Sequence, residues 1–371
     1  MESAQSTHNI GVVGCGYWGP NLIRNFSALN TCRVKTVCDM SQARLDHMSS
    51  LYRSVTTTSC FDEMVRDEEI DAIAVATHVN SHYDLAKKSL LAGKHTFIEK
   101  PMASSTAQCD ELVELARQRG LQLMVGHTFI YSSPVRKIRE IIDSGEIGDL
   151  LYVSARRLNL GLFQKDINVT WDLAPHDISI ILYMFGEAPV SVSCHGKAHI
   201  NPGIEDVTTL ILNYANGKFV TIQSSWLDPQ KIREMKFVGT KKMICYDDNE
   251  TNEKIKVYDK SVEVPPHYDT FAEFHYSYHY GDMYSPYVAQ SEPLKVECQH
   301  FLDCIDGKAA CLSGGREGLH VVQILEASLK SLRSDGATIK IDTNGNGNGH
   351  GLKTHQGPAP TGRAIHESHI C

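Results

Sequence analysis

The stretch Asn9–Gly19, which reads NIGVVGCGYWG, decides the fold of this 371-residue chain. The run NIGVV is short and apolar, which is typical of a strand buried on both faces. It is followed at once by GCGYWG, so Gly14, Gly16 and Gly19 have the G-x-G-x-x-G spacing. In that spacing the first glycine permits a tight turn, the second lets backbone amides approach a pyrophosphate, and the third allows close helix–strand packing.

The surrounding sequence favours dinucleotide binding over an ordinary glycine-rich loop. A helical pattern through Leu22, Ile23 and Phe26 follows the glycines, and Asp39 ends the next apolar run. Asp39 lies about 20 residues beyond the last glycine, the distance at which a carboxylate meets the ribose hydroxyls. A carboxylate there would repel the extra phosphate of NADP, and no arginine follows it directly, so we expect NAD. The alternative makes Asp39 a turn or cap residue before the next helix.

The first 126 residues alternate short apolar runs with helical stretches, which predicts a doubly wound parallel sheet. The expected strands are Asn9–Val13, Arg33–Cys38, Ile70–Ala76, His95–Glu99 and Leu121–Val125. Before the last strand, Ser104 is expected to cap a helix that stops at Gly120. We therefore expect an N-terminal Rossmann domain over residues 1–126.

After Gly126 a helix from Pro134 is followed by a succession of strands, which predicts an α/β domain with a large, mostly antiparallel open sheet at residues 127–342. The expected strands are Leu150–Leu158, Pro189–Gly196, Asp206–Tyr214, Lys218–Trp226, Glu234–Val238 and Lys254–Tyr258. Asn216-Gly217 predicts a type I′ hairpin turn. Two late helices, around Glu297–Ile305 and Glu317–Leu332, are expected to close the core. Residues 343–371, rich in glycine and polar residues, are expected to be a disordered tail.

Composition excludes several classes of function. A hydrophobic fraction of 42% with 22% charged residues is typical of a globular protein, and a net charge of −8 argues against nucleic acid and anionic membranes as partners. The sequence shows no signal peptide pattern and no membrane-spanning apolar run. Eleven cysteines without a C-x-x-C pair indicate reduced thiols. We therefore expect a cytoplasmic protein.

The tripeptide Glu99-Lys100-Pro101 provides the first candidate catalytic residue. It places Lys100 at the carboxyl edge of the parallel sheet, where doubly wound folds bind ligands. A lysine there can hydrogen-bond a substrate oxygen, and burial of its amine would lower the pKa so that it can relay a proton. The alternative is a solvated surface lysine.

The segment WDLAPHDISIILYMFG provides the second candidate, because Asp172 and His176 are four residues apart and would share one side of a helix. An imidazole beside a carboxylate is a reasonable acid–base pair for removing a hydroxyl proton as hydride leaves. The alternative is structural, with Asp172 as an N-cap and Pro175 in an early helical turn.

Two pairs of histidines share the same i,i+4 spacing, which could suggest metal ligation. They are His78 with His82 and His275 with His279. No third ligand with recognisable spacing stands near either pair, so we expect no metal.

Together these pieces resemble the Gfo/Idh/MocA family of oxidoreductases over about residues 9–342. The resemblance rests on GCGYWG, Asp39, ATHVNSH, EKP and the D-x-x-x-H of WDLAPHD. It implies a Rossmann domain and a second domain whose open sheet packs in homodimers or homotetramers. It also implies that His176 is the principal acid–base group, that Asp172 orients the reacting hydroxyl, and that Lys100 binds the substrate oxygen.

The resemblance further implies where NAD would bind. The glycine turn would supply Gly14, Gly16, Tyr17, Trp18 and Gly19, and Asp39 would bind the ribose. Thr77, His82 and Glu99 would lie around the nicotinamide end. Two positions depart from the family pattern: His78 replaces a frequent proline, and Pro175 replaces a frequent glycine.

The substrate suggested by the resemblance is an activated sugar. GYWGPNL, HDIS and EPLKVECQHFLDCI are similar to members found with nucleotide-sugar and deoxysugar assembly enzymes, so we expect oxidation or ketone reduction at the 3-position of a hexose. Arg156, Arg157 and Lys165 are expected to supply cations for a phosphate or carboxylate, unless they are only exposed charges. His127 is expected to line the sugar pocket. An inositol or free-sugar dehydrogenase, an NAD-dependent glycosidase and a non-catalytic NAD-binding regulator remain alternatives.

Overall fold

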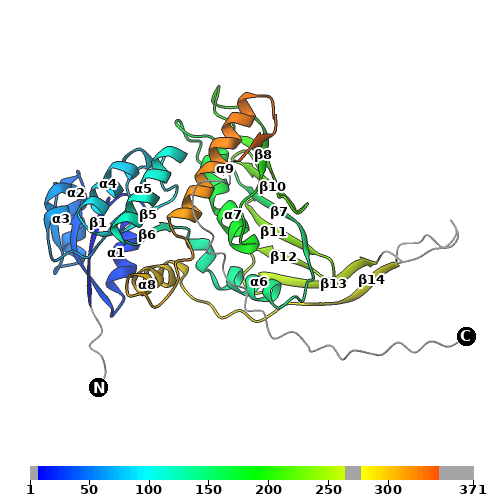
Figure 1. Ribbon diagram of the computed structural model, residues 1–371, viewed down its shortest axis with the longest axis horizontal. Coiled ribbons are helices and arrows are strands. Elements are labelled where there is room, and N and C mark those ends of the chain that lie inside the picture. The colour runs from blue at the N-terminus through cyan, green and yellow to red at the C-terminus, as the bar shows by residue number, and fades with distance from the viewer. Residues whose placement is uncertain (1–6, 264–276, 342–371) are drawn as a thin grey trace, which may run out of the picture. The chain divides into compact units, whose positions relative to one another are not determined.

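The computed structural model describes residues 7–263 and 277–341, which carry two sheets flanked by helices (Figure 1). The first sheet is parallel throughout and has the strand order β3-β2-β1-β4-β5-β6. Its strands are β1 His8–Val13, β2 Cys32–Cys38, β3 Thr56–Thr58, β4 Ala72–Val75, β5 His95–Glu99 and β6 Leu123–Gly126. The order reverses between β1 and β4, which opens a crevice at their carboxyl ends. The predicted Rossmann sheet is therefore confirmed.

Five helices connect these strands: α1 Gly19–Ser27, α2 Gln42–Leu51, α3 Phe61–Arg66, α4 Val79–Leu91 and α5 Thr106–Arg119. Helix α1 buries Leu22, Ile23 and Phe26, the apolar stripe that its sequence predicts. The cap of α5 differs from the prediction. Ser105, not Ser104, is the N-cap, because its hydroxyl accepts a hydrogen bond from the Gln108 backbone N–H.

The second sheet has the order β14-β13-β12-β11-β7-β10-β9-β8-β15 and is antiparallel except between β7 and β10. Its strands are β7 Leu150–Leu158, β8 Ser191–Lys197, β9 Val207–Asn213, β10 Phe219–Ser225, β11 Ile232–Gly239, β12 Met243–Asp247, β13 Ile255–Glu263, β14 Ser277–Tyr284 and β15 Ile339–Lys340. The predicted mostly antiparallel sheet is confirmed. Strands β12, β14 and β15 were not expected from the sequence.

The hairpin between β9 and β10 forms where Asn216-Gly217 predicts it, but its turn type is different. Gly217 has a φ of 81°. Asn216 does not have a positive φ, because Asp335 is the non-glycine residue that does within the described ranges. The Tyr214 carbonyl accepts a hydrogen bond from the Gly217 N–H at 3.2 Å. The type I′ turn is therefore wrong, since Ala215 and Asn216 form the centre of the turn and only Gly217 is left-handed.

The remaining helical elements are η1 Thr128–Tyr131, α6 Ser133–Asp143, α7 Val169–Phe185, α8 Pro293–Ile305 and α9 Gly315–Arg333. Helix α7 packs on β7, β9 and β10, and α9 packs on both α5 and β8 (Figure 1). Helix α9 therefore links the two sheets within one compact unit that ends at Ile341. The boundary expected near residue 126 stays a prediction.

Part of the sequence lies outside the described residues. This part includes residues 343–371 and His275, so the expected disordered tail and the expectation that His275 and His279 hold no metal stay predictions. Among the described helices, none is long and apolar enough to cross a membrane.

Three buried phenylalanines join the first sheet to helices α1 and α8, which pack against each other. Phe97 of β5 packs edge-on against Phe26 of α1, with ring centroids 6.3 Å apart, and against Phe301 of α8, with centroids 5.7 Å apart. All three side chains are fully buried. Because Phe97 lies two residues before Glu99, this cluster fixes the end of β5, from which Lys100 projects.

Replacing Phe301 by alanine is expected to lower the free energy of unfolding by about 3–5 kcal/mol, because it removes ring contacts and leaves a cavity. Urea unfolding followed by circular dichroism measures the change. Leu91→Ala is the control, since Leu91 is 47% exposed, and it should cost far less. Equal losses in the two variants would contradict the proposed role of the cluster.

Candidate active site

The turn after β1 has the backbone geometry that its glycines predict. Gly14 has a φ of 94°, and a Cβ there would lie 2.6 Å from the Ala76 carbonyl oxygen. A Cβ on Gly19 would lie 1.8 Å from the Gly14 carbonyl oxygen. Around Gly16, by contrast, the nearest atom is 3.9 Å from the Cβ position. Gly14 and Gly19 thus shape the turn, and Gly16 leaves space over it.

A cavity of about 590 Å³ opens over this turn. Of the predicted cofactor residues, it is lined by Gly14, Gly16, Tyr17, Trp18, Asp39 and Thr77. Tyr17 stands at the rim, with 93% of its surface exposed. A cavity at the amino end of α1, with a cradle that a Cβ would fill, fits the pyrophosphate and ribose of NAD.

Asp39 lies at the end of β2 and is tied to the glycine turn. One carboxylate oxygen accepts a hydrogen bond from the Cys15 N–H at 2.6 Å, and the other accepts from the Ser41 N–H at 2.8 Å. Ser41 is the cap residue of α2, so Asp39 does not cap this helix, but its bond with the Ser41 N–H is the turn contact that the alternative also allowed. Arg44 lies 3.6 Å from the Asp39 carboxylate. The expectation of NAD rested on the absence of an arginine directly after Asp39, and Arg44 comes later in the chain.

Thr77 and His82 make hydrogen bonds at the rim of the crevice. Ser81 donates to the Thr77 hydroxyl at 2.8 Å. The buried His82 ring lies 2.9 Å from the Pro101 carbonyl oxygen and 3.0 Å from the Thr77 carbonyl oxygen. Burial lowers the pKa of His82, and the hydrogen bonds with the two carbonyl oxygens oppose that change. The ring thus lies between the end of β4 and the turn after Lys100.

Lys100 lies at the carboxyl end of β5 and contacts the helix that carries the other two predicted catalytic residues. Its Nζ donates to the Asp172 backbone carbonyl oxygen at 3.4 Å. Burial lowers the pKa of Lys100, and the charges of Asp172 and Glu99 oppose that change. The structure therefore places this amine in a partly desolvated setting rather than at a fully solvated surface.

Asp172 and His176 lie one turn apart on α7. The helix begins at Val169 and is capped by Asn168, whose side chain accepts from the Trp171 N–H at 3.2 Å. The alternative with Asp172 as the N-cap is therefore wrong. The Asp172 carboxylate accepts a hydrogen bond from the indole N–H of Trp226 at 2.9 Å, which holds it beside Lys100.

The imidazole of His176 is neutral at physiological pH. Burial lowers its pKa well below the ordinary value, and the charges of Lys100 and Arg157 lower it further. Its Nδ1 is buried without a hydrogen-bond partner among the described residues. The ring packs edge-on against Phe129 of η1, with centroids 4.8 Å apart. A neutral, desolvated imidazole of this kind can accept a proton.

His127 and Glu99 lie in the interior close to Lys100. Burial lowers the pKa of His127 to about 3, and the charge of Lys100 adds to this effect. Burial raises the pKa of Glu99 to about 7. Both ring nitrogens of His127 and Oε1 of Glu99 find no hydrogen-bond partner in the described part of the chain. Orphaned polar atoms beside Lys100 fit a polar ligand group, such as a sugar hydroxyl or the nicotinamide amide.

The three expected substrate cations are placed very differently. Arg156 and Arg157 are neighbours on β7, so they point to opposite faces of the sheet. Arg157 faces α7 and forms a buried two-bond ion pair with Asp177 at 2.8 and 2.9 Å. Arg156 lies 3.7 Å from Glu234. Arg156 faces away from the site, and the guanidinium of Arg157 is already paired with Asp177. Neither arginine is therefore a free cation for a substrate phosphate or carboxylate. Lys165 is exposed on the loop between β7 and α7.

Sequence patterns missed several residues around the site. Trp226, which binds the Asp172 carboxylate, follows β10 and is distant from any motif. Arg233 of β11 is the register partner of Arg157, and its charge contributes to the lowered pKa of His176. Only the pairing of β7 with β11 brings Arg233 there, and no local signal in the sequence reveals such a pairing.

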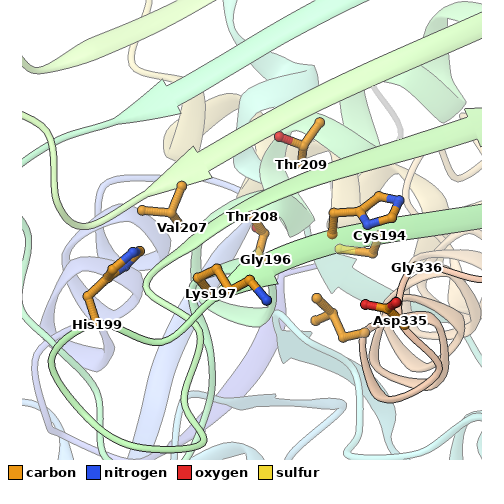
Figure 2. Close-up of a pocket in the computed structure, with 11 residues that line it drawn as sticks. Cys194, Gly196, Lys197, His199, Val207, Thr208, Thr209, Asp335 and Gly336 are labelled. Atoms are coloured by element: carbon orange, nitrogen blue, oxygen red, sulfur yellow. The ribbon is translucent and has the colours of Figure 1, made fainter.

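A second hollow, of about 320 Å³, lies against the second sheet (Figure 2). It is formed by β8, β9 and the segment that follows α9, with Lys197, His199 and Asp335 among its lining residues. None of the predicted catalytic and cofactor residues is among its lining residues.

Comparison with known proteins agrees with this architecture. Residues 8–127 match the family model described as "Oxidoreductase family, NAD-binding Rossmann fold", and residues 135–245 match the "GFO/IDH/MocA C-terminal domain". An uncharacterized oxidoreductase of Bacillus subtilis, YrbE, is 25% identical over 337 residues, which cover 87% of this chain and 93% of the relative.

Two relatives with named activities are also similar. The UDP-N-acetylglucosamine 3-dehydrogenase of Acidithiobacillus ferrooxidans is 27% identical over 61% of this chain and 69% of its own length. A solved structure of that enzyme has a TM-score of 0.73 at 22% identity and covers 89% of this chain and 99% of its own. The myo-inositol 2-dehydrogenase of Thermotoga maritima is 24% identical over 58% of this chain and 68% of its own length. The chain therefore belongs to the Gfo/Idh/MocA family of NAD-binding oxidoreductases.

Proposed function

We propose that this protein is an NAD-dependent dehydrogenase that oxidises a secondary hydroxyl, at C3, of a nucleotide-linked hexose, or reduces the corresponding ketone. The observation that carries the proposal is the meeting of Lys100, at the end of β5, with the helix that bears Asp172 and His176. The similarity to a UDP-N-acetylglucosamine 3-dehydrogenase supports the choice of a nucleotide sugar and of C3.

Each of the three residues has a defined part in this proposal. The unprotonated His176 takes the hydroxyl proton at Nε2, because its Nδ1 is buried. The Lys100 ammonium donates a hydrogen bond to the same oxygen and stabilises the negative charge that develops on it. Asp172, held by Trp226, orients the hydroxyl between them. NAD, held by the glycine turn and Asp39, would supply the hydride acceptor for this reaction.

We assign the substrate diphosphate to Lys165 and Arg233 in place of the two arginines of β7. Lys165 is exposed on the loop that leads into α7. Arg233 faces the same side of the sheet as Arg157, and its pairing with Asp248 is loose, at 3.5 Å. Its side chain is 37% exposed, so it can reorient toward a phosphate.

A myo-inositol or free-sugar dehydrogenase is the second candidate, supported by the similarity to the Thermotoga maritima enzyme. It would use Lys100, Asp172 and His176 in the same roles. The two candidates differ in whether the substrate carries a diphosphate, and hence in whether Lys165 and Arg233 contribute to binding.

We also propose a homo-oligomer that buries the open face of the second sheet. Tyr152 of β7 and Phe219 of β10 are register partners there, and they are 42% and 39% exposed. Adjacent exposed aromatics on a sheet face are typical of a protein interface. The cytoplasmic location expected from the sequence stays a prediction.

A substrate panel tests the proposed function. UDP-hexoses should support NADH formation, measured by absorbance, at a higher kcat/KM than the matching free sugars and inositols. Turnover of inositols or free sugars together with indifference to UDP-sugars would establish the second candidate instead. Glycosidic cleavage without NADH accumulation would indicate a glycosidase, and no turnover of any of these compounds would favour a regulator.

His176→Ala and Lys100→Ala are expected to lower kcat by about 10²- to 10⁴-fold, because each removes a group that handles the reacting proton or oxygen. NAD binding, measured by calorimetry, should persist because the glycine turn is unchanged. His47→Ala, at an exposed position on α2, is the matched control and should retain full activity. Full turnover in the His176 variant would contradict its role as the base.

The pH profile of kcat/KM for alcohol oxidation is expected to be displaced at both ends. His176 must be neutral to act, so the acid limb should lie below its ordinary pKa of 6.5, because burial lowers that value. Lys100 must be protonated to donate, so the alkaline limb should lie below 10.5, because burial lowers its pKa too. If the acid limb instead lies above pH 6.5 and is still seen in the residual activity of His176→Ala, the group that titrates there is not His176.

A further inference from the structure

A cluster of one histidine and two cysteines lies at the end of α8, on elements that the proposed dehydrogenase reaction does not use. His300 and Cys304 are one turn apart on α8, and Cys311 lies on the segment that leads to α9. The imidazole nitrogen and the two sulfurs all lie within 4.8 Å of one another. Residues from two segments thus present three metal-ligating atoms to one point.

The spacing of these atoms fits a tetrahedral zinc ion. With zinc–sulfur and zinc–nitrogen bonds of about 2.3 and 2.0 Å, sulfur and nitrogen ligands lie roughly 3.5 Å apart and two sulfurs roughly 3.8 Å apart. Cys304 Sγ lies 3.4 Å from His300 Nε2, so this pair needs almost no movement. Two thiolates and an imidazole are also the ligands that zinc prefers over harder oxygen donors.

The cluster is mostly buried, but part of it is accessible to an ion from solvent. Cys304 is 1% exposed and His300 is 9% exposed, whereas Cys311 is half-buried. The His300 ring packs at 5.3 Å from the Tyr131 ring, which fixes its orientation. His300 also borders a cavity of about 430 Å³ beside α8, and the half-buried Cys311 is the ligand that an ion from solvent reaches first.

We propose that His300 Nε2, Cys304 Sγ and Cys311 Sγ bind one zinc ion, with the fourth position taken by solvent. The two thiols lose their protons to bulk water as the two zinc–sulfur bonds form, so no oxidant or reductant is needed. The Leu312 N–H, which donates to His300 Nε2 at 3.1 Å in the metal-free cluster, turns to a thiolate sulfur. The ion ties the segment around Cys311 to α8.

A zinc titration of the full chain, stripped with a chelator under reducing conditions, tests the site. With a chromogenic chelator as competitor, the wild type should bind one equivalent of zinc with a Kd below about 1 μM. Cys311→Ser should weaken binding by at least about 100-fold, because removing a ligand costs more than removing an outer-shell partner. Cys245→Ser is the matched control, since this thiol is half-buried on β12, and it should bind like the wild type.

Two further readouts identify the ligands without relying on activity. Cobalt(II) should give thiolate-to-metal charge-transfer absorption in the wild type and lose part of it in Cys311→Ser. Zinc should raise the melting temperature of the wild type but not of that variant. Less than one equivalent of tight zinc, or equal binding by Cys311→Ser, would overturn the proposal. So would a Cys304–Cys311 disulfide that forms in air and persists in excess zinc, shown by intact mass and peptide mapping.

Discussion

The proposed active site depends on one contact: the amine of Lys100, at the carboxyl end of a parallel strand, donates a hydrogen bond to the Asp172 backbone carbonyl of α7. Hydride transfer to a dinucleotide requires the cofactor and the acid–base group to meet at one carbon. The first sheet supplies the glycine turn, and α7, which packs on the second sheet, supplies His176. Helix α9 packs on both sheets and therefore fixes the glycine turn and α7 relative to each other.

Desolvation then gives the converging groups their chemical character. Burial lowers the pKa of Lys100, His127 and His176 and raises that of Glu99. The guanidinium of Arg157, held in place by its ion pair with Asp177, lies near His176 and lowers its pKa further. Because a neutral imidazole beside cations resists protonation, the same packing that excludes water also sets the base in its reactive form.

The local parts of this architecture could be predicted from the sequence. Gly14, Gly19 and the bounds of β5 follow from short-range patterns whose physical causes lie within a few residues. Strand β3 could not be predicted, because its three threonines carry no apolar run. The placement of Trp226 and Arg233 depends on strand pairing, which joins positions far apart in the chain.

Alternation along a strand explains the main departure from the expected site. Arg156 and Arg157 look equivalent in the sequence, yet β7 directs only Arg157 toward α7, where Asp177 binds it. The cluster of His300, Cys304 and Cys311 was missed for a related reason. Its H-x3-C-x6-C spacing contains no C-x-x-C pair, and only the path from α8 to α9 brings Cys311 back to the helix.

The most direct test of the central claim is a crystal structure of the protein with NAD bound. The pyrophosphate is expected to lie on the turn at Gly16, and the nicotinamide C4 is expected to face the space between Lys100 Nζ and the His176 ring. A nicotinamide ring directed away from Lys100, or a His176 ring out of reach of a hydroxyl placed at that carbon, would contradict this claim.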